Sequence, residues 1–215
     1  MAKAKRHPLP WTPEEHELLS RLKSPPKIQE FLDSIVYSEE SRYRSPRTVM
    51  RDRKGHCFDG AVFAASALRM LGHEPLIVDL LAVRDDDHVL AMYKKYGCWG
   101  AVAKSNFAGL RFREPIYRTL RELALSYFES FYNLHREKTL RSYTDPLNLR
   151  LYDAHNWMTD DETMELIGTK LCYIKTHKIM TPPMIRALSA VDSRTYESGL
   201  LGANPAGLYD PGSDA

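Results

Sequence analysis

The chain has 215 residues, of which 43% are hydrophobic and 27% are charged. This balance is that of an ordinary globular protein and excludes a disordered or fibrous chain. The formal net charge of +2 is too small to indicate a nucleic-acid or acidic-membrane partner. A chain of this length fits within one domain, and we expect a single domain over residues 1–215.

Three widely spaced cysteines, Cys57, Cys98 and Cys172, argue against a disulfide framework and fit a reducing compartment. Their spacing contains no CxxC or Cys/His cluster, so we expect no metal site. The basic N-terminus is not followed by an apolar segment, and no apolar run is long enough to span a bilayer. These features predict a cytoplasmic protein with no membrane association.

Residues 11–36 form an N-terminal helical lead. Thr12, Pro13 and Glu15 have the spacing of a capping box with proline at the first helical position, which predicts a helix start. After the Pro25–Pro26 break, apolar residues at helical spacing predict a second short helix. The polar stretch from Tyr37 to Gly55 is expected to be irregular and exposed.

Residues 55–132 carry the most informative patterns. Apolar residues recur at helical spacing from Cys57 to Leu71, and Gly72 follows as a stop signal. The branched, apolar run 76–83 predicts a buried strand. Segments 88–93 and 98–103 then predict a hairpin across residues 94–97.

Pro115 predicts the start of a long amphipathic helix that reaches Phe131. The remaining residues, 133–215, form a C-terminal extension with weaker patterns. We expect a strand near 147–151 and helices over 162–174 and 183–191. The end, from Gly202 onward, is rich in turn-forming residues and is expected to be loose.

The residues suited to chemistry are Cys57, at the start of a predicted helix, and His88, at the start of a predicted strand. A helix N-terminus favours the nucleophilic thiolate through its dipole and its unpaired N–H groups. A nearby imidazole can take the thiol proton and return it to a leaving group. The backbone N–H of Cys57 is free to help bind an oxyanion.

This arrangement resembles the transglutaminase-like superfamily. The segment from Gly55 to Ala65, followed by Leu68-Arg-Met-Leu-Gly72, is similar to that family's nucleophile helix. Asp87-His88-Val89 is similar to its histidine strand, and Gly97-Cys98-Trp99 to the strand that follows. The resemblance covers roughly residues 55–106. It implies an α+β, papain-related fold in which the nucleophile helix packs on an antiparallel sheet.

The family usually places an Asp a few residues after the tryptophan, where it orients the imidazole. The corresponding position here is Ala103, which has no hydrogen-bonding side chain. Ser105 and Asn106 are the nearest polar candidates, and Asn fills this role in papain-like enzymes. A hairpin register that pairs Tyr93 with Cys98 puts His88 opposite Ala103. A two-residue change puts it opposite Ser105.

Three further residues are candidates for binding substrate. Trp99 is a core residue or a lid over the thiol. Arg111 and Arg113 can bind a substrate carboxylate or phosphate, although structural ion pairs are the commoner role of such residues. The three aspartates 85–87 are expected to form a solvated turn, and Asp59 is given no catalytic role because a negative charge beside a thiolate opposes its formation.

The sequence therefore predicts a cysteine-dependent acyl-transfer enzyme acting on peptide or amide-containing substrates without a cofactor. Cys57 is the nucleophile, His88 the base and then the acid, and Ser105 or Asn106 the orienting group. The acyl-enzyme is resolved by water or by an amine. The alternative is a non-catalytic transglutaminase-like binding or scaffold module.

Overall fold

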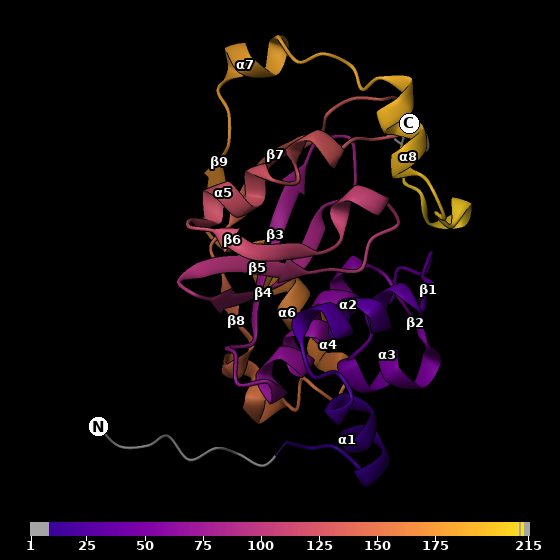
Figure 1. Cartoon of the computed structure of the whole chain (residues 1–215), viewed down its shortest axis with the longest axis vertical. Coiled ribbons are helices and arrows are strands. Elements are labelled where there is room, and N and C mark those ends of the chain that lie inside the picture. The colour runs from indigo at the N-terminus through magenta and orange to yellow at the C-terminus, as the bar shows by residue number, and fades with distance from the viewer. Residues whose placement is uncertain (1–8, 211, 213–215) are drawn as a thin grey trace.

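The computed structural model describes residues 9–210 and 212, which form an α+β fold (Figure 1). Its first half contains α1 (Pro13–Ser20), α2 (Pro25–Asp33), β1 (Val36–Tyr37), α3 (Pro46–Asp52), β2 (Lys54–Gly55), α4 (Cys57–Met70), β3 (Leu76–Ala82), β4 (His88–Lys95) and β5 (Cys98–Val102). Its second half contains β6 (Arg113–Tyr117), α5 (Leu120–Leu125), β7 (Leu140–Thr144), β8 (Leu147–Asn148), α6 (Glu162–Leu171), β9 (Thr176–Lys178), α7 (Pro182–Arg186) and α8 (Ser193–Gly199).

The main sheet is antiparallel, with strand order β6-β5-β4-β3-β7-β9, and β8 pairs with β3. Strands β7 and β9 come from the C-terminal extension, so that region completes the same sheet as the central segment. A separate parallel pair joins β1 to β2. Within the described residues, no helix is both long and apolar enough to span a bilayer.

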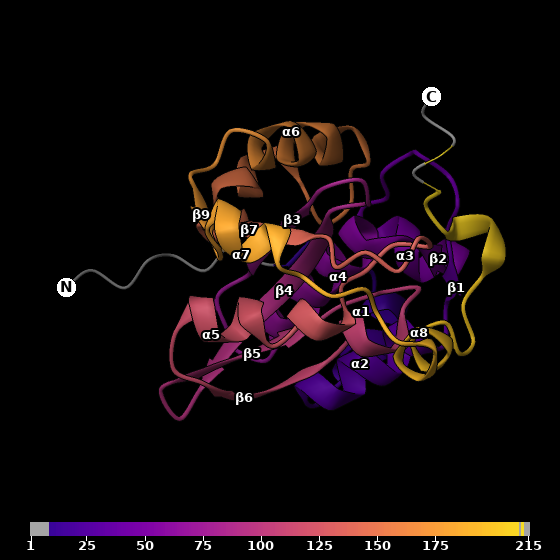
Figure 2. The same ribbon diagram turned by 90° about the horizontal axis from the view of Figure 1, so that it is seen from above.

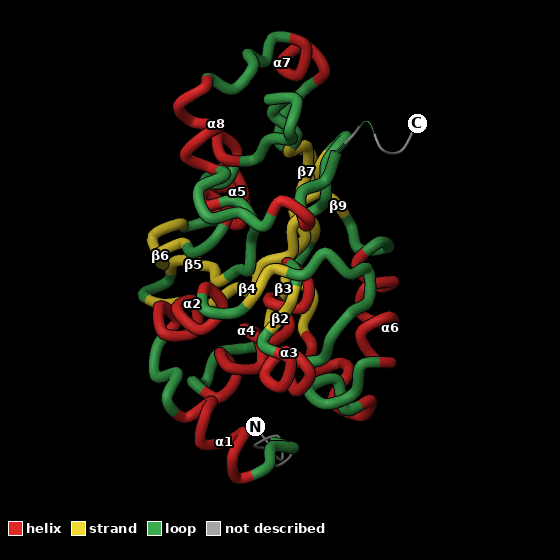
Figure 3. Tube along the Cα trace, turned by 90° about the vertical axis from the view of Figure 1, so that its right-hand side faces the viewer, coloured by secondary structure: helices red, strands yellow, loops and turns green. Residues whose placement is uncertain are grey.

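Two hydrophobic cores cover the two faces of the sheet. Helices α1, α2, α3, α4 and α6 pack on one face, and α5 packs on the other. Figures 2 and 3 show α6 and α5 on opposite sides of the strands. Strand β4 divides its side chains between these cores because successive residues point to opposite faces. Val89, Ala91 and Tyr93 face α4, whereas Leu90 and Met92 face α5.

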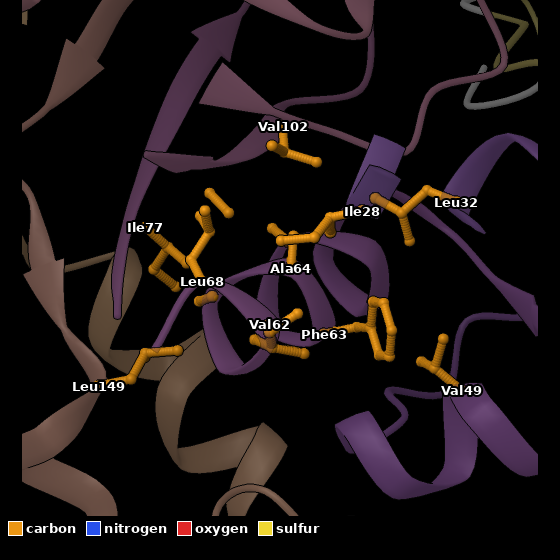
Figure 4. Packing of buried hydrophobic residues seen from close by; sticks show 14 of the residues in the cluster. Ile28, Leu32, Val49, Val62, Phe63, Ala64, Leu68, Ile77, Val102 and Leu149 are labelled. Atoms are coloured by element: carbon orange, nitrogen blue, oxygen red, sulfur yellow. The ribbon is translucent and has the colours of Figure 1, made fainter. Parts of the chain in front are cut away.

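Helix α4 is buried along most of its length. Phe63 stacks on Phe31 of α2 with ring centroids 4.5 Å apart, and Ala64 lies among Ile28, Leu68 and other aliphatic side chains (Figure 4). Burial of such apolar surface contributes about 25 cal/mol per Å². This packing fixes the position of the first turn of α4, and therefore of Cys57.

The β4–β5 hairpin turns at residues 96–97, with Tyr93 opposite Gly100 and Ala91 opposite Val102. The two strands separate after Val102 because the Gln29 side chain forms hydrogen bonds with both the main-chain nitrogen and the main-chain oxygen of Ala103. Gln29 Nε2 donates to the Ala103 oxygen at 2.9 Å, and its Oε1 accepts from the Ala103 nitrogen at 3.1 Å. The first residues of β4 therefore have no β5 partner.

Three sequence predictions were wrong at the level of secondary structure. Residues 113–117 form β6 instead of the start of a long helix, and the rest of the predicted helix is reduced to α5 over Leu120–Leu125 and a short 3-10 helix over Phe128–Ser130. The expected strand at 147–151 is limited to β8 and continues as a 3-10 helix over Leu149–His155. The polar stretch before Cys57 contains α3, and Arg44 within it is completely buried.

Candidate active site

Cys57 is the first residue of α4, as the apolar spacing of this segment predicted. Its Sγ donates a hydrogen bond of 3.6 Å to the main-chain oxygen of Asp87, the residue before His88. Burial raises the pKa of the Cys57 thiol to about 12, and the nearby carboxylates of Asp79, Asp86 and Asp59 add to this effect, against the favourable N–H of Val89. The resting sulfur is therefore a protonated thiol.

His88 is the first residue of β4, and its ring lies on the α5 face of the sheet, near the edges of Tyr127 and Phe131. Its Nε2 is 2.7 Å from the main-chain oxygen of Leu110. Because a carbonyl oxygen can only accept, Nε2 carries the proton and Nδ1 has the free lone pair. The His88 pKa is lowered to about 4, mainly by burial and with a contribution from the Arg113 charge, against the raising effect of the Leu110 bond.

Cys57 borders two cavities. The larger one, here called the acidic pocket, has a volume of about 450 Å³ and is lined by Cys57, His56, Asp79, Tyr37, Tyr43, Glu39, Glu40 and other residues. The smaller one, here called the small cavity, has a volume of about 40 Å³ and is lined by Cys57, His88, Ser105, Asn106, Leu110 and others. His88 borders only the small cavity. No hydrogen bond joins its ring to the Cys57 sulfur among the interactions of the described residues.

Neither Ser105 nor Asn106 orients the imidazole, although both line the small cavity. Ser105 Oγ accepts from the Phe107 nitrogen at 3.0 Å. Asn106 forms two reciprocal bonds to the main chain of Asn204, of 2.8 and 2.7 Å. The β4–β5 register, continued past Val102, would place Ser105 opposite His88, but pairing stops where Gln29 holds Ala103. The Leu110 carbonyl takes the orienting position instead.

None of the three predicted substrate-binding residues lines a cavity that Cys57 borders. Trp99 packs with the α5-side core and lies under Lys94. Arg113 stacks over Tyr127 with its guanidinium carbon 3.9 Å from the ring centre, and it donates to nearby carbonyls. Arg111 forms an ion pair with Asp33 at 3.0 Å and borders a separate cavity of about 400 Å³.

Asp59, in the first turn of α4, is completely buried and has a structural role. It accepts from the main-chain nitrogen of Arg44 at 2.8 Å and forms an ion pair with the Arg44 guanidinium at 3.2 Å. It also accepts from the nitrogen of His56 at 3.2 Å, which satisfies one free N–H group at the helix start. This network anchors the loop before α3 to the first turn of α4.

Two site residues were missed by the sequence analysis. Asp79 interrupts the apolar run of β3 and lines the acidic pocket. A carboxylate within a predicted buried strand was the feature of the sequence that could have indicated a site residue there. Tyr37 lines both cavities that Cys57 borders, and burial raises its pKa well above the usual value, with the Cys57 sulfur contributing. Nothing in its local sequence marks Tyr37 as a site residue.

The C-terminal segment also reaches the site, which its turn-rich composition did not predict. Residues 206–209 line the acidic pocket, and Asn204 Nδ2 donates to the Tyr37 oxygen at 3.1 Å. In Figures 1 and 2 this yellow segment lies beside β1. The expectation of a loose end was therefore wrong for residues 204–209, whereas residues 211 and 213–215 lie outside the described part of the chain.

Comparison with known proteins does not assign the chain to a family. No protein-family model matches the chain, and no curated protein matches it. What the structure establishes is the class: an α+β protein with an antiparallel sheet and a cysteine at the start of a buried helix.

Proposed function

We propose that the chain is a cysteine-dependent acyl-transfer enzyme of the transglutaminase-like kind, acting on amide or peptide bonds. The observation that carries this proposal is that Cys57 and His88 line one small cavity while the imidazole Nε2 is held by the Leu110 oxygen. This leaves Nδ1 as the nitrogen able to accept the thiol proton. An orienting carbonyl fixes the ring tautomer, as a carboxylate or amide does in other cysteine enzymes.

The proposed reaction starts from neutral partners. As Cys57 Sγ attacks the substrate carbonyl carbon, His88 Nδ1 takes the thiol proton, and the carbonyl oxygen becomes the oxyanion. The Cys57 backbone N–H, at the first position of α4, supplies one donor to that oxygen. His88 then gives the proton to the leaving amine as the carbon–nitrogen bond breaks. Water or a second amine cleaves the thioester and regenerates the thiol.

The neutral resting states of the Cys57 thiol and the His88 imidazole determine how the proton is transferred. A preformed thiolate–imidazolium pair is disfavoured because burial raises the thiol pKa and lowers the imidazole pKa. Proton transfer must therefore accompany attack, so His88 acts as a general base. General-base catalysis typically contributes about 10²–10⁴-fold to a rate. Reaction with substrate is thus expected to depend on His88 more strongly than simple alkylation of the sulfur does.

Single-turnover acylation tests this proposal. The full chain is mixed with p-nitrophenyl acetate, and the acetylated cysteine is located by peptide mass spectrometry. We expect Cys57 to acetylate faster than exposed Cys172, and His88→Gln to slow Cys57 by about 10²-fold or more. Cys172→Ser serves as the matched control and should leave the Cys57 rate unchanged. If Cys57 is acetylated at the same rate in the parent protein and in His88→Gln, the proposal is refuted.

A non-catalytic transglutaminase-like binding module is the second candidate. It is favoured by the position of the His88 ring on the α5 face of the sheet, whereas α4 with Cys57 packs on the other face. Burial that keeps the thiol protonated and the three carboxylates near the sulfur, which oppose thiolate formation, favour it too. In that case Cys57 is a structural residue in the wall of a ligand pocket. The acylation experiment separates the candidates, since a binding module gives no acylation that depends on His88. For either candidate we propose a cytoplasmic location, which suits three free thiols.

A further inference from the structure

Asp79 is a buried carboxylate with an unsatisfied oxygen. The residue is 7% exposed, and its Oδ1, which has almost no surface exposed to solvent, has no hydrogen-bond partner in the described part of the chain. The Leu80 backbone N–H is the favourable polar neighbour of this carboxyl group, and no lysine or arginine acts as its counter-charge. It sits on β3 opposite Val89, on the face of the sheet that packs against α4, and it borders the acidic pocket. A buried carboxylate without a partner is costly, so such a group usually marks a place where a ligand completes its bonding.

The acidic pocket has a strongly one-sided charge. Five carboxylates line it, and no lysine or arginine does so; the five are Glu39, Glu40, Asp79, Asp86 and Asp87. Lys54 forms ion pairs with Glu39 and Glu40 from outside the pocket, at 3.3 and 2.9 Å. Arg42 and Arg44 also pair with Glu40, so these two glutamates already have cationic partners. Asp87 accepts from the Ala82 nitrogen at 2.7 Å. Asp79 is thus the buried pocket carboxylate with an open acceptor position.

The rest of the pocket wall suits an organic cation. Tyr37, Tyr43 and Tyr209 contribute aromatic rings, whose faces attract cations. Leu171 and Val89 add apolar surface for an alkyl chain. A volume of about 450 Å³ is within the usual range of small-ligand sites. A metal ion fits less well, because no group of three or more His, Cys, Asp or Glu residues in the described chain is arranged to hold one.

We propose that the acidic pocket binds an organic cation, with the ligand's ammonium or guanidinium group paired to the Asp79 carboxylate. This extends the proposed function by naming the charge of the substrate, and it depends on that function only for the ligand's approach to Cys57. The cation supplies the counter-charge that the Asp79 carboxylate lacks, and its alkyl chain lies along the apolar and aromatic wall toward the thiol. Charge-assisted bonds of this kind are among the strongest polar contacts in a protected site.

Binding is measured with n-butylammonium as the probe, by heteronuclear NMR titration of the full chain carrying Cys57→Ser. The serine removes acyl transfer, so the experiment reports on the cation alone. We expect saturable shifts at residues lining the acidic pocket, and neither n-butanol nor butyrate should reproduce them. Asp79→Asn should weaken binding at least tenfold, because the amide carries no charge.

Asp85→Asn is the control, because Asp85 is a partly buried carboxyl group with a raised pKa that lines the small cavity instead of the acidic pocket. It should leave the affinity for n-butylammonium within twofold of its starting value. Equal binding of butylammonium and butanol, or unchanged affinity in Asp79→Asn, would overturn the inference. Loss of cation binding with retained acylation that depends on His88 would reject this inference and leave the proposed enzyme standing.

Discussion

Replacing Asp79 with asparagine is expected to stabilise the protein at alkaline pH. Burial raises the pKa of Asp79 to about 7, and the Asp87 charge adds to this effect. The native state therefore holds the Asp79 proton up to about pH 7, whereas the unfolded chain releases it near pH 4. Between pH 4 and pH 7 the unfolded state binds fewer protons than the native state. The free energy of unfolding is therefore unaffected by Asp79 ionisation below pH 4, and it decreases as the pH rises from 4 to about 7.

The size of the effect follows from the same pKa. Each pH unit between about 4 and 7 removes about 1.4 kcal/mol of folding free energy, which gives an upper value of about 4 kcal/mol above pH 7. Asparagine has nearly the same shape and carries no charge. We therefore expect Asp79→Asn to be more stable than the parent by about 2–4 kcal/mol at pH 8.5, and to differ by less than about 1 kcal/mol at pH 4.5.

Urea unfolding at the two pH values measures this difference. Asp85, another carboxyl group with a raised pKa, titrates in both proteins and largely cancels in the comparison. Glu197→Gln, at an exposed position, is the control and should change stability by less than about 0.5 kcal/mol at either pH. A stability difference that is independent of pH would show that Asp79 is not a buried carboxyl group without a counter-charge.

Two further predictions concern the surroundings of Cys57. Arg44→Met should destabilise the fold by about 3–5 kcal/mol in urea unfolding, because it removes the arginine partner of buried Asp59 and leaves only His56, 3.5 Å away, as a possible cationic neighbour; an unchanged midpoint would contradict the anchoring role of the Arg44–Asp59 ion pair. Asn106→Ala removes both bonds to the C-terminal segment, worth about 2 kcal/mol together. Methyl methanethiosulfonate should then modify Cys57 about tenfold faster, and an unchanged rate would show that residues 206–209 do not restrict access to the sulfur.

The part of the fold nearest the site could be predicted because local patterns and packing agree there. The spacing of apolar and small residues in Cys57–Met70 predicts a buried helix, and Gly72 ends it with a positive φ of 91°. The apolar run of β3 and the β4–β5 hairpin follow from composition and turn chemistry in the same way. Cys57 and His88 therefore lie at the starts of the predicted elements.

Other features depend on contacts between distant segments, which one sequence does not reveal. Pro115 indicates a helix start, but β6 is an edge strand, where a residue without an N–H group is tolerated. The orienting group on His88 is the main-chain oxygen of Leu110, and any residue type could supply it. Asn106 was a reasonable orienting residue by its chemistry, yet its amide bonds to Asn204, 98 positions later in the chain.

The protonation of His88 tests the central claim most directly, and nitrogen-15 NMR of the histidine-labelled chain at pH 7 measures it. The proposed chemistry requires a neutral ring with its proton on Nε2 and a free lone pair on Nδ1 beside the Cys57 thiol. We expect the Nδ1 signal of an unprotonated nitrogen, and a clear shift of that signal when Cys57 is methylthiolated. A proton on Nδ1, or an Nδ1 signal that does not respond to the modified sulfur, would contradict the assignment of His88 as the base for Cys57.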